Sequence, residues 1–189
     1  MFLSDAEIKR LVAEKPDFIT DFVPEKRQLM GISYGLDPHG YTFRLHPRFT
    51  WFRPQSRGRQ GGLVEPEDGD VEVIELGEGE NFPLPPYHCL QVASLETFSL
   101  PTNLVGLLFG KSTYARQGLA YNMTVVDAGF SGQLVFTVVN LNPVRDIILY
   151  PYSGIAQIMF VKANPAEVPY KAVGGRVNFG AEINSQKAR

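Results

Sequence analysis

The sequence predicts one mainly β domain, arranged as an antiparallel sandwich or barrel. Short apolar runs with alternating aromatic residues recur along the chain, and turn residues such as Pro85-Pro86 and Asn142-Pro143 separate them. Eighteen glycines and 14 prolines in 189 residues are too many for a helical bundle. Because this length is usual for one domain, residues 1–189 are expected to form a single unit.

One short helix is expected near the N-terminus, over about residues 5–14. Ser4 and Glu7 have the spacing of a capping box, and Pro16 ends the pattern. The apolar side chains that fall on one face of this helix are Ile8, Leu11 and Val12. An amphipathic helix of this kind covers part of the core.

Strands follow from about residue 41 to residue 161. Alternating or continuous apolar runs predict them at 41–46, 49–52, 71–76, 88–94, 104–109, 133–141, 146–150 and 155–161. The segment 53–70 is rich in glycine, proline and charge, so it is expected to be a mobile loop and not a domain boundary.

Charge and cysteine content exclude several classes of function. Eighteen basic and 20 acidic residues give a net charge of −2, which argues against a nucleic-acid partner. The single Cys89 cannot form an internal disulfide, and three histidines leave few ligands for a zinc site. The chain begins with neither a signal peptide nor an apolar run long enough for a membrane span, so a cytoplasmic protein is expected.

The block GKSTYARQG at 110–118 is the first candidate for a binding site. Lys111, Ser112, Thr113 and Arg116 lie within seven residues of Gly110, directly after an apolar strand. Two cations, two hydroxyls and free backbone N–H groups suit a polyanion such as a triphosphate. A solvated helix start is the alternative interpretation.

A second candidate is Asp127 in NMTVVDAGFSGQLVFTVVN, residues 122–140. Asp127 ends an apolar run and precedes Gly129 and Gly132, which predicts a carboxylate at the tip of a hairpin. Ordinary turn chemistry explains the same pattern. Thr137 lies in the middle of the following strand, and no carboxylate is near it on its face.

Four blocks resemble successive motifs of the dCTP deaminase and dUTPase superfamily. They are GISYGLDPHGYTFRL (31–45), LFGKSTYARQG (108–118), VVDAGFSGQLVFTVVN (125–140) and YPYSGIAQIMF (150–160), in the order and spacing of that superfamily. The resemblance implies a distorted β-barrel of the trimeric dUTPase type, with active sites between subunits. It also implies a pyrimidine deoxynucleoside triphosphate as substrate and Mg²⁺ carried by its phosphates.

The same resemblance assigns roles to individual residues. Asp127 matches the aspartate that activates water in the hydrolase members. The positions that match phosphate-binding residues are Lys111, Ser112, Thr113, Arg116 and Gln157. The base and sugar are expected to lie against the hairpin at Asn122, Thr124 and Val125. Uracil, cytosine, thymine and modified pyrimidines all stay open as the base.

One position departs from the deaminase pattern. Deaminases of this superfamily carry a glutamate in the strand after the hairpin, and Thr137 occupies that position here. A hydroxyl of very high pKa cannot act as a general base near pH 7. The sequence therefore predicts a homotrimeric dUTPase that hydrolyses dUTP to dUMP and diphosphate. The alternatives are a dCTP deaminase in which another group replaces the glutamate, and an inactive nucleotide-binding homologue.

The C-terminal residues 172–189 are expected to form a mobile arm that orders on binding. GGRVNFGAEINS is similar to the dUTPase C-terminal motif, in which an aromatic ring covers the base. Phe179 and Arg176 would take the base and phosphate roles. Ala181-Glu182 replaces the small hydroxyl pair of that motif, and a disordered terminus is the alternative.

Overall fold

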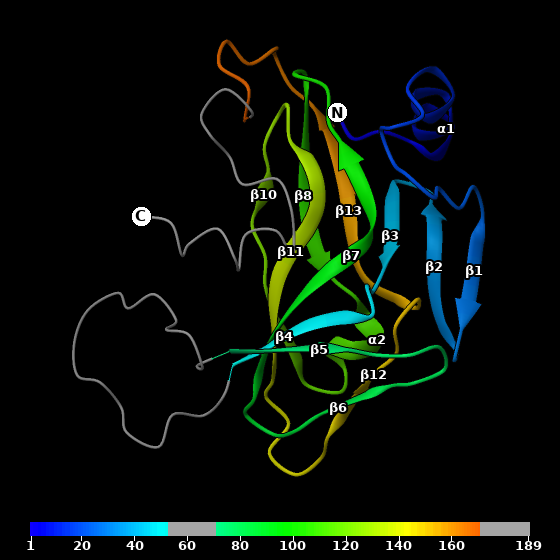
Figure 1. Cartoon of the computed structure of the whole chain (residues 1–189). Helices are drawn as coiled ribbons and strands as arrows, with labels where there is room; N and C mark the ends of the chain where they lie inside the picture. Colours follow the sequence, from blue (N-terminus) through cyan, green and yellow to red (C-terminus); the bar gives the residue numbers. More distant parts are fainter. Residues whose placement is uncertain (53–70, 171–189) are drawn as a thin grey trace, which may run out of the picture.

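Two antiparallel sheets pack against each other in the structure, a computed structural model that describes residues 1–52 and 71–170 (Figure 1). The mainly β prediction is confirmed. The predicted mobile loop at 53–70 and the predicted arm at 172–189 lie outside the described residues, as do Arg176 and Phe179.

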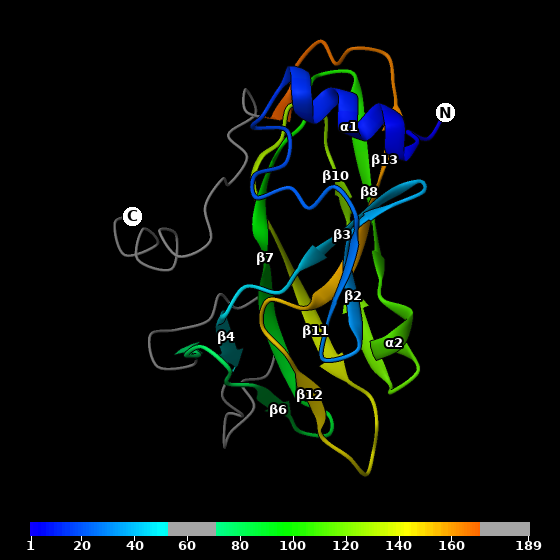
Figure 2. The same cartoon turned by 90° about the vertical axis from the view of Figure 1, so that its right-hand side faces the viewer.

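The predicted N-terminal helix is confirmed as α1, Asp5–Glu14. Its capping box is complete, because the Glu7 amide donates to Ser4 Oγ at 3.4 Å and the Ser4 amide donates to Glu7 Oε2 at 3.0 Å. Ile8 is fully buried. The helix lies across one end of the two sheets (Figure 2) and ties that end to the core.

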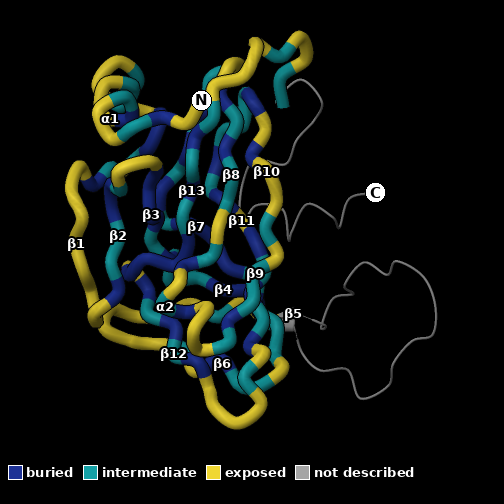
Figure 3. The backbone as a smooth tube through the Cα atoms, turned by 180° about the vertical axis from the view of Figure 1, so that it is seen from behind, coloured by how far each residue is buried: buried dark blue, intermediate teal, exposed yellow. Residues whose placement is uncertain are grey.

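The first sheet has six strands, and it carries Gln157 and ends one of its strands at Gly110, directly before Lys111. Its order is β1 (Lys26–Leu29), β2 (Ile32–Asp37), β3 (Gly40–Arg44), β13 (Gly154–Lys162), β8 (Leu104–Gly110) and β10 (Val125–Val126). The edge strand β1 is exposed along its whole length, whereas β3 is largely buried (Figure 3).

The second sheet has five strands and carries Thr137. Its order is β5 (Val71–Glu75), β4 (Arg48–Phe52), β7 (Cys89–Ser99), β11 (Ser131–Asn140) and β9 (Leu119–Asn122). A small third sheet pairs β12 (Ile147–Leu149) with β6 (Phe82–Leu84). All eight predicted strands are present. Of the additional strands, β6, β9 and β10 are short and β1 is exposed, and β2 (Ile32–Asp37) lacks a regular alternation of apolar residues.

The core between the sheets contains aliphatic and aromatic side chains and one buried ion pair. Phe43 on β3 lies 6.0 Å from the ring of Phe98 on β7 and 5.9 Å from that of Phe136 on β11. The fully buried Glu96 of β7 accepts hydrogen bonds at 2.8 Å from Arg44 Nε and at 3.1 Å from the Tyr41 hydroxyl. These contacts join the two sheets, because Tyr41 and Arg44 both belong to β3.

The predicted closed barrel is corrected by the strand order. β1 and β10 end the first sheet, and β5 and β9 end the second, so the described strands form separate sheets. The alternating pattern predicts where the strands lie. It does not predict whether the sheets close into a barrel, because closure depends on pairing between edge strands. The helix start that was the alternative interpretation of the 110–118 block is present as a one-turn helix, α2 (Ser112–Ala115). Within the described ranges, no helix is long and apolar enough to cross a membrane.

Candidate functional site

The turn from β8 into α2 places the side chains of the 110–118 block. Gly110 ends β8, and a Cβ atom there would lie 2.4 Å from the ring of Tyr121 on β9. Glycine is therefore required by packing against β9. Tyr114 is fully buried and anchors α2, and its hydroxyl accepts a hydrogen bond from the Tyr150 amide at 3.3 Å.

The predicted phosphate-binding residues of this block differ in exposure. Lys111 is buried, and its Nζ donates to Ser33 Oγ at 2.9 Å. Burial lowers the pKa of Lys111. Ser112 and Arg116 are exposed, and Thr113 is half-buried. Among the described residues the Arg116 guanidinium has no carboxylate partner, so it can still bind an anion.

Gln157 lies on β13, between β3 and β8 in the first sheet. It pairs in register with Thr42 on β3 and Phe109 on β8. Its Nε2 donates to Asp37 Oδ2 and to Thr42 Oγ1, each at 3.1 Å. The structure thus places Gln157 in a network of polar side chains on β2 and β3.

Asp37 at the end of β2 is the centre of that network. Its Oδ1 lies 2.8 Å from Lys26 Nζ, and its Oδ2 accepts from Thr42 and Gln157. These hydrogen bonds lower the pKa of Asp37, although burial opposes them. The Asp37 charge also acts on Lys111. We call this group the β2–β13 network, and it comprises Lys26, Ser33, Asp37, Thr42, Lys111 and Gln157.

Sequence reasoning missed four members of the β2–β13 network. Lys26, Ser33, Asp37 and Thr42 lie 69 or more positions before Lys111 along the chain, and only the sheet order brings them together. Asp37 precedes a proline and resembles an ordinary turn residue. The one signal available was the block at 31–45, which resembles a superfamily motif and contains Ser33, Asp37 and Thr42, but no site role was assigned to it.

Asp127 lies in the turn between β10 and β11, but the predicted hairpin is wrong, because β10 pairs with β8 in the first sheet and β11 belongs to the second sheet. The Phe130 amide donates to the Asp127 carbonyl at 3.1 Å, which closes a turn over residues 127–130. Asp127 is exposed, and its carboxylate has no hydrogen-bond or ion-pair partner among the residues that the structure describes. The Asp127 side chain is thus available to a ligand.

The segment 163–170 covers the inner side of this turn, and we call it the strap. Amides of Ala163 and Ala166 donate to the 102–103 turn at 2.9 Å, and the Tyr170 amide donates to the Ala128 carbonyl at 3.0 Å. The rings of Tyr170 and Phe130 lie 5.5 Å apart. At Gly129, whose φ is +81°, a Cβ atom would lie 2.6 Å from Pro169 Cβ, so the strap leaves no space for a side chain there.

Thr137 lies between two neutral polar residues on the outer face of the second sheet. It pairs in register with Gln91 on β7 and with Asn122 on β9. Neither neighbour carries a carboxylate, in agreement with the prediction. Asn122 is thereby placed beside Thr137, and Thr124 and Val125 follow it as exposed residues.

The predicted site residues of one chain therefore form three groups. Lys111 and Gln157 belong to the β2–β13 network, Asn122 lies beside Thr137, and Asp127 is alone in its turn. In the described parts of the chain, no group of three or more histidine, cysteine or acidic residues could hold a metal ion.

Comparisons with known proteins identify the family and correct the predicted activity. A family model described as dCTP deaminase-like matches residues 2–163. The dCTP deaminase of Campylobacter concisus is 31% identical over 174 residues, which cover 92% of this chain and 90% of that protein. A dCTP deaminase of the dUMP-forming type from Dictyoglomus turgidum is 32% identical over 178 residues, covering 93% and 88%.

The fold agrees with that of a solved deaminase. The structure of 2′-deoxycytidine 5′-triphosphate deaminase from Agrobacterium tumefaciens superimposes with a TM-score of 0.60 at 19% identity. The match covers 84% of this chain and 47% of that one, so the chain spans about half of that protein's length. This likeness concerns the fold alone.

The predicted superfamily is confirmed, but the prediction of a dUTPase activity was wrong. It gave the replaced glutamate at Thr137 more weight than the rest of the sequence. Relatives named dCTP deaminase match over nine-tenths of the chain, and a single replaced side chain does not change the scaffold that the remaining residues form. The chain belongs to the dCTP deaminase-like family, within the dCTP deaminase and dUTPase superfamily.

Proposed function

We propose that this protein binds dCTP and converts it with water to dUTP and ammonia. The observation that carries the proposal is the match to dCTP deaminases along nearly the whole chain, which includes the 110–118 block. The buried Lys111 and the exposed Arg116 offer two cations to the triphosphate. Ser112 and Thr113 add hydroxyl donors, and Gln157 adds an amide donor.

The proton transfers are assigned to Asp127. Water adds to C4 of cytosine and gives its proton to a base, and the proton then passes to the amino group, which leaves as ammonia. Thr137 can orient the water but cannot accept its proton near pH 7. Asp127 is an exposed carboxylate in the connection that leads into the strand of Thr137, and it is free among the described residues to take this role.

The base is proposed to lie against Asn122, Thr124 and Val125. Asn122 is exposed beside Thr137, and Thr124 and Val125, at the start of β10, are exposed as well. Mg²⁺ is proposed to arrive bound to the triphosphate, since an ion that bridges phosphate oxygens needs few protein ligands. Phe179 and Arg176 keep their proposed roles over the base and phosphates.

A homotrimer is proposed to complete the site. The outer face of β7, β11 and β9 carries no charge around Thr137. The residues of this face are Cys89, Gln91, Ala93, Val135, Thr137, Val139, Ala120 and Asn122. Val135 is 42% exposed there, and the absence of charge around it on this face would suit a contact between copies. Contact between copies at this face would bring Asp127 of one chain toward another chain's residues.

The direct test is ammonia release from dCTP with Mg²⁺, with the nucleotide product separated by ion-exchange chromatography. We expect dUTP and ammonia in equal amounts. The same assay with dUTP, dTTP and 5-methyl-dCTP defines the base. Absence of ammonia from every cytosine nucleotide would contradict the proposal.

A second candidate function follows from Thr137 itself. With no carboxylate among its cross-strand neighbours, the chain could bind dCTP without turning it over. Tight binding without ammonia release from the natural protein would favour this candidate. In that case Thr137→Glu should introduce deamination, because the strand would regain the acid–base group that the family uses.

A further inference from the structure

One proposed phosphate-binding residue, Gln157, is held by an internal carboxylate group. Asp37 accepts a hydrogen bond from Gln157 Nε2 at 3.1 Å, and its charge acts on the buried Lys111. A carboxylate and a phosphate offer the same acceptor chemistry to amide and ammonium donors. A triphosphate that binds Gln157 must therefore replace Asp37 as its partner.

The surroundings of Asp37 allow such an exchange. The side chain of Asp37 is only 12% exposed, and Lys26 Nζ lies 2.8 Å from its other oxygen. Lys26 belongs to the exposed edge strand β1, and its side chain is 55% exposed. It can follow the carboxylate when Gln157 is released, so the charge of Asp37 stays compensated. Thr42 donates to Asp37 and accepts from Gln157, which links the two partners.

We infer that Asp37 is a placeholder for phosphate, which holds Gln157 in position and sets how tightly the phosphate chain binds. Asp37 is thus a positioning residue and not a ligand. This inference rests on the proposed function, because it takes Lys111 and Gln157 as phosphate ligands. It predicts that removal of the Asp37 charge tightens nucleotide binding, whereas a merely structural role predicts weaker binding.

The test measures nucleotide affinity of Asp37→Asn by isothermal titration calorimetry. The probe is α,β-imido-dUTP with Mg²⁺, which has no amino group to lose and no cleavable bond between its first two phosphates. We expect the variant to bind this probe about tenfold more tightly than the natural protein, since one repulsive charge is removed. For dUMP, which carries fewer charges, the gain should be smaller.

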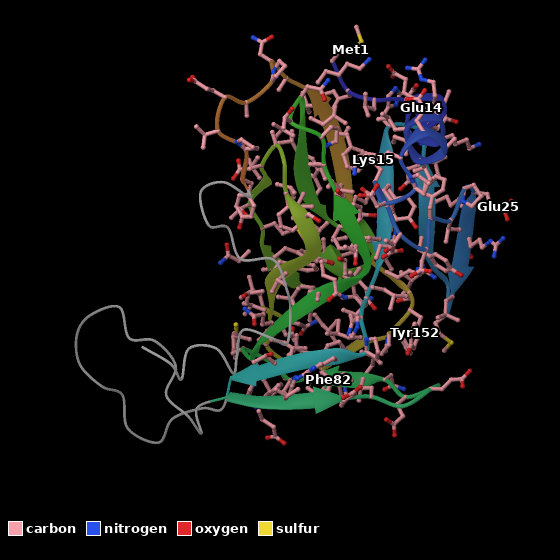
Figure 4. All side chains as sticks on the ribbon, turned by 45° about the horizontal axis from the view of Figure 1, so that its top comes forward. Met1, Glu14, Lys15, Glu25, Phe82 and Tyr152 are labelled. Atoms are coloured by element: carbon pink, nitrogen blue, oxygen red, sulfur yellow. The ribbon has the colours of Figure 1, made fainter. Side chains whose placement is uncertain are left out.

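A matched control separates local from overall charge. Glu14→Gln changes the net charge by the same amount at the last turn of α1, where Figure 4 shows the side chain outside the sheets. Glu14 is exposed and forms only a 3.9 Å pair with Arg10. This control should leave the affinity of the probe within twofold of the natural value. A tenfold gain in the control would overturn the local interpretation.

A double-mutant cycle tests the exchange at Gln157. In a Gln157→Met background, Asp37→Asn should gain about threefold or less, because the released donor is no longer present. An undiminished tenfold gain would show an effect of charge alone and would overturn the placeholder role. Lys26→Met is a second variant, at an exposed position where the protein should still fold. It should weaken probe binding about tenfold, because the charge of Asp37 is then no longer compensated. Unchanged or tighter binding in this variant would contradict the inference.

The outcomes distinguish the inference from the proposed function. If the natural protein binds neither dCTP nor the probe, the proposed function fails and the inference fails with it. If the natural protein binds the probe and Asp37→Asn binds it equally or less tightly, only the inference is overturned.

Discussion

The β2–β13 network and the Asp127 turn hold their functional side chains in opposite ways. Lys111 is buried and Gln157 half-buried, and side-chain hydrogen bonds fix both to residues on β2 and β3. Asp127 is exposed, and only its backbone is held, by its own turn and by the strap. In the proposed enzyme, the groups that bind phosphate are thus preorganised, and the group that moves protons is left free.

This difference follows from what each group must do. A cation or amide that binds phosphate gains affinity when its position is fixed in advance. A carboxylate that accepts and returns a proton needs contact with water and substrate more than it needs a fixed protein partner. Substitutions in the two regions should therefore separate activity, binding and stability.

The largest expected effect is the loss of activity in Asp127→Asn. If Asp127 carries the proton, kcat for ammonia release should fall by about 10²–10⁴-fold. The free energy of unfolding should stay within about 0.5 kcal/mol, because the exposed carboxylate has no partner among the described residues.

The measurements are ammonia release and urea denaturation of both proteins. Affinity for the imido analogue should change little. A variant that keeps natural kcat would assign the proton transfer to another residue, and a large loss of stability would show that Asp127 has a structural role.

Lys111→Met should give the opposite pattern. Loss of the cation should weaken binding of the triphosphate analogue by about 10- to 100-fold, the range for a charged hydrogen bond. The free energy of unfolding should stay the same or rise slightly. Burial lowers the pKa of Lys111, and the same burial means that the charged side chain destabilises the folded protein.

Calorimetry with the analogue and thermal unfolding check this prediction. The exposed Lys9→Met on α1 is a matched control, and it should leave analogue affinity unchanged. Natural affinity in Lys111→Met would remove Lys111 from the phosphate site.

The two regions also differ in how far the sequence predicts them. Asp127 and its turn could be predicted, because an aspartate followed by glycines at the end of an apolar run is a local pattern. Lys111 was found in the same way, within its short block. Asp37 and Ser33 lie in the motif block at 31–45, but their contacts to Gln157 and Lys111 could not be predicted, because these depend on the order β2-β3-β13-β8 in the sheet.

The fold shows the same limit. Each strand of alternating apolar residues could be predicted, and so could α1 with its capping box. The open edges at β1 and β10 could not, since closure is decided by pairing between distant strands. The replacement at Thr137 was visible in the sequence, but its effect on activity is a property of the whole site.

A smaller effect is expected from Tyr170→Ala in the strap. The pair of Tyr170 and Phe130 rings should contribute about 0.5–1.5 kcal/mol to stability. Because the strap holds the Asp127 turn, kcat should fall more than affinity for the analogue. Tyr170→Phe keeps the ring and should restore both stability and kcat.

Urea denaturation, ammonia release and calorimetry on the two variants test this prediction. Equal losses of kcat and affinity in Tyr170→Ala would show that the strap acts on the whole site. Failure of Tyr170→Phe to restore kcat would assign the effect to the hydroxyl group.

The smallest expected effect concerns the far end of β13, the strand that carries Gln157. Lys162 Nζ lies 2.6 Å from Glu7 Oε1 on α1, and this bond lowers the pKa of Glu7 to about 2. A carboxyl group whose pKa is lowered by folding stabilises the fold above its unfolded value, near 4.5, and this contribution is lost as pH falls toward 2. The melting temperature should therefore fall between pH 5 and pH 2, and less steeply in Glu7→Gln.

Because the pair is partly exposed, salt should weaken it as well. The Asp127 turn lies outside this contact, so analogue affinity at pH 7 should be equal in both proteins. Identical slopes of melting temperature against pH would show that the Glu7 to Lys162 contact does not tie α1 to β13 in solution.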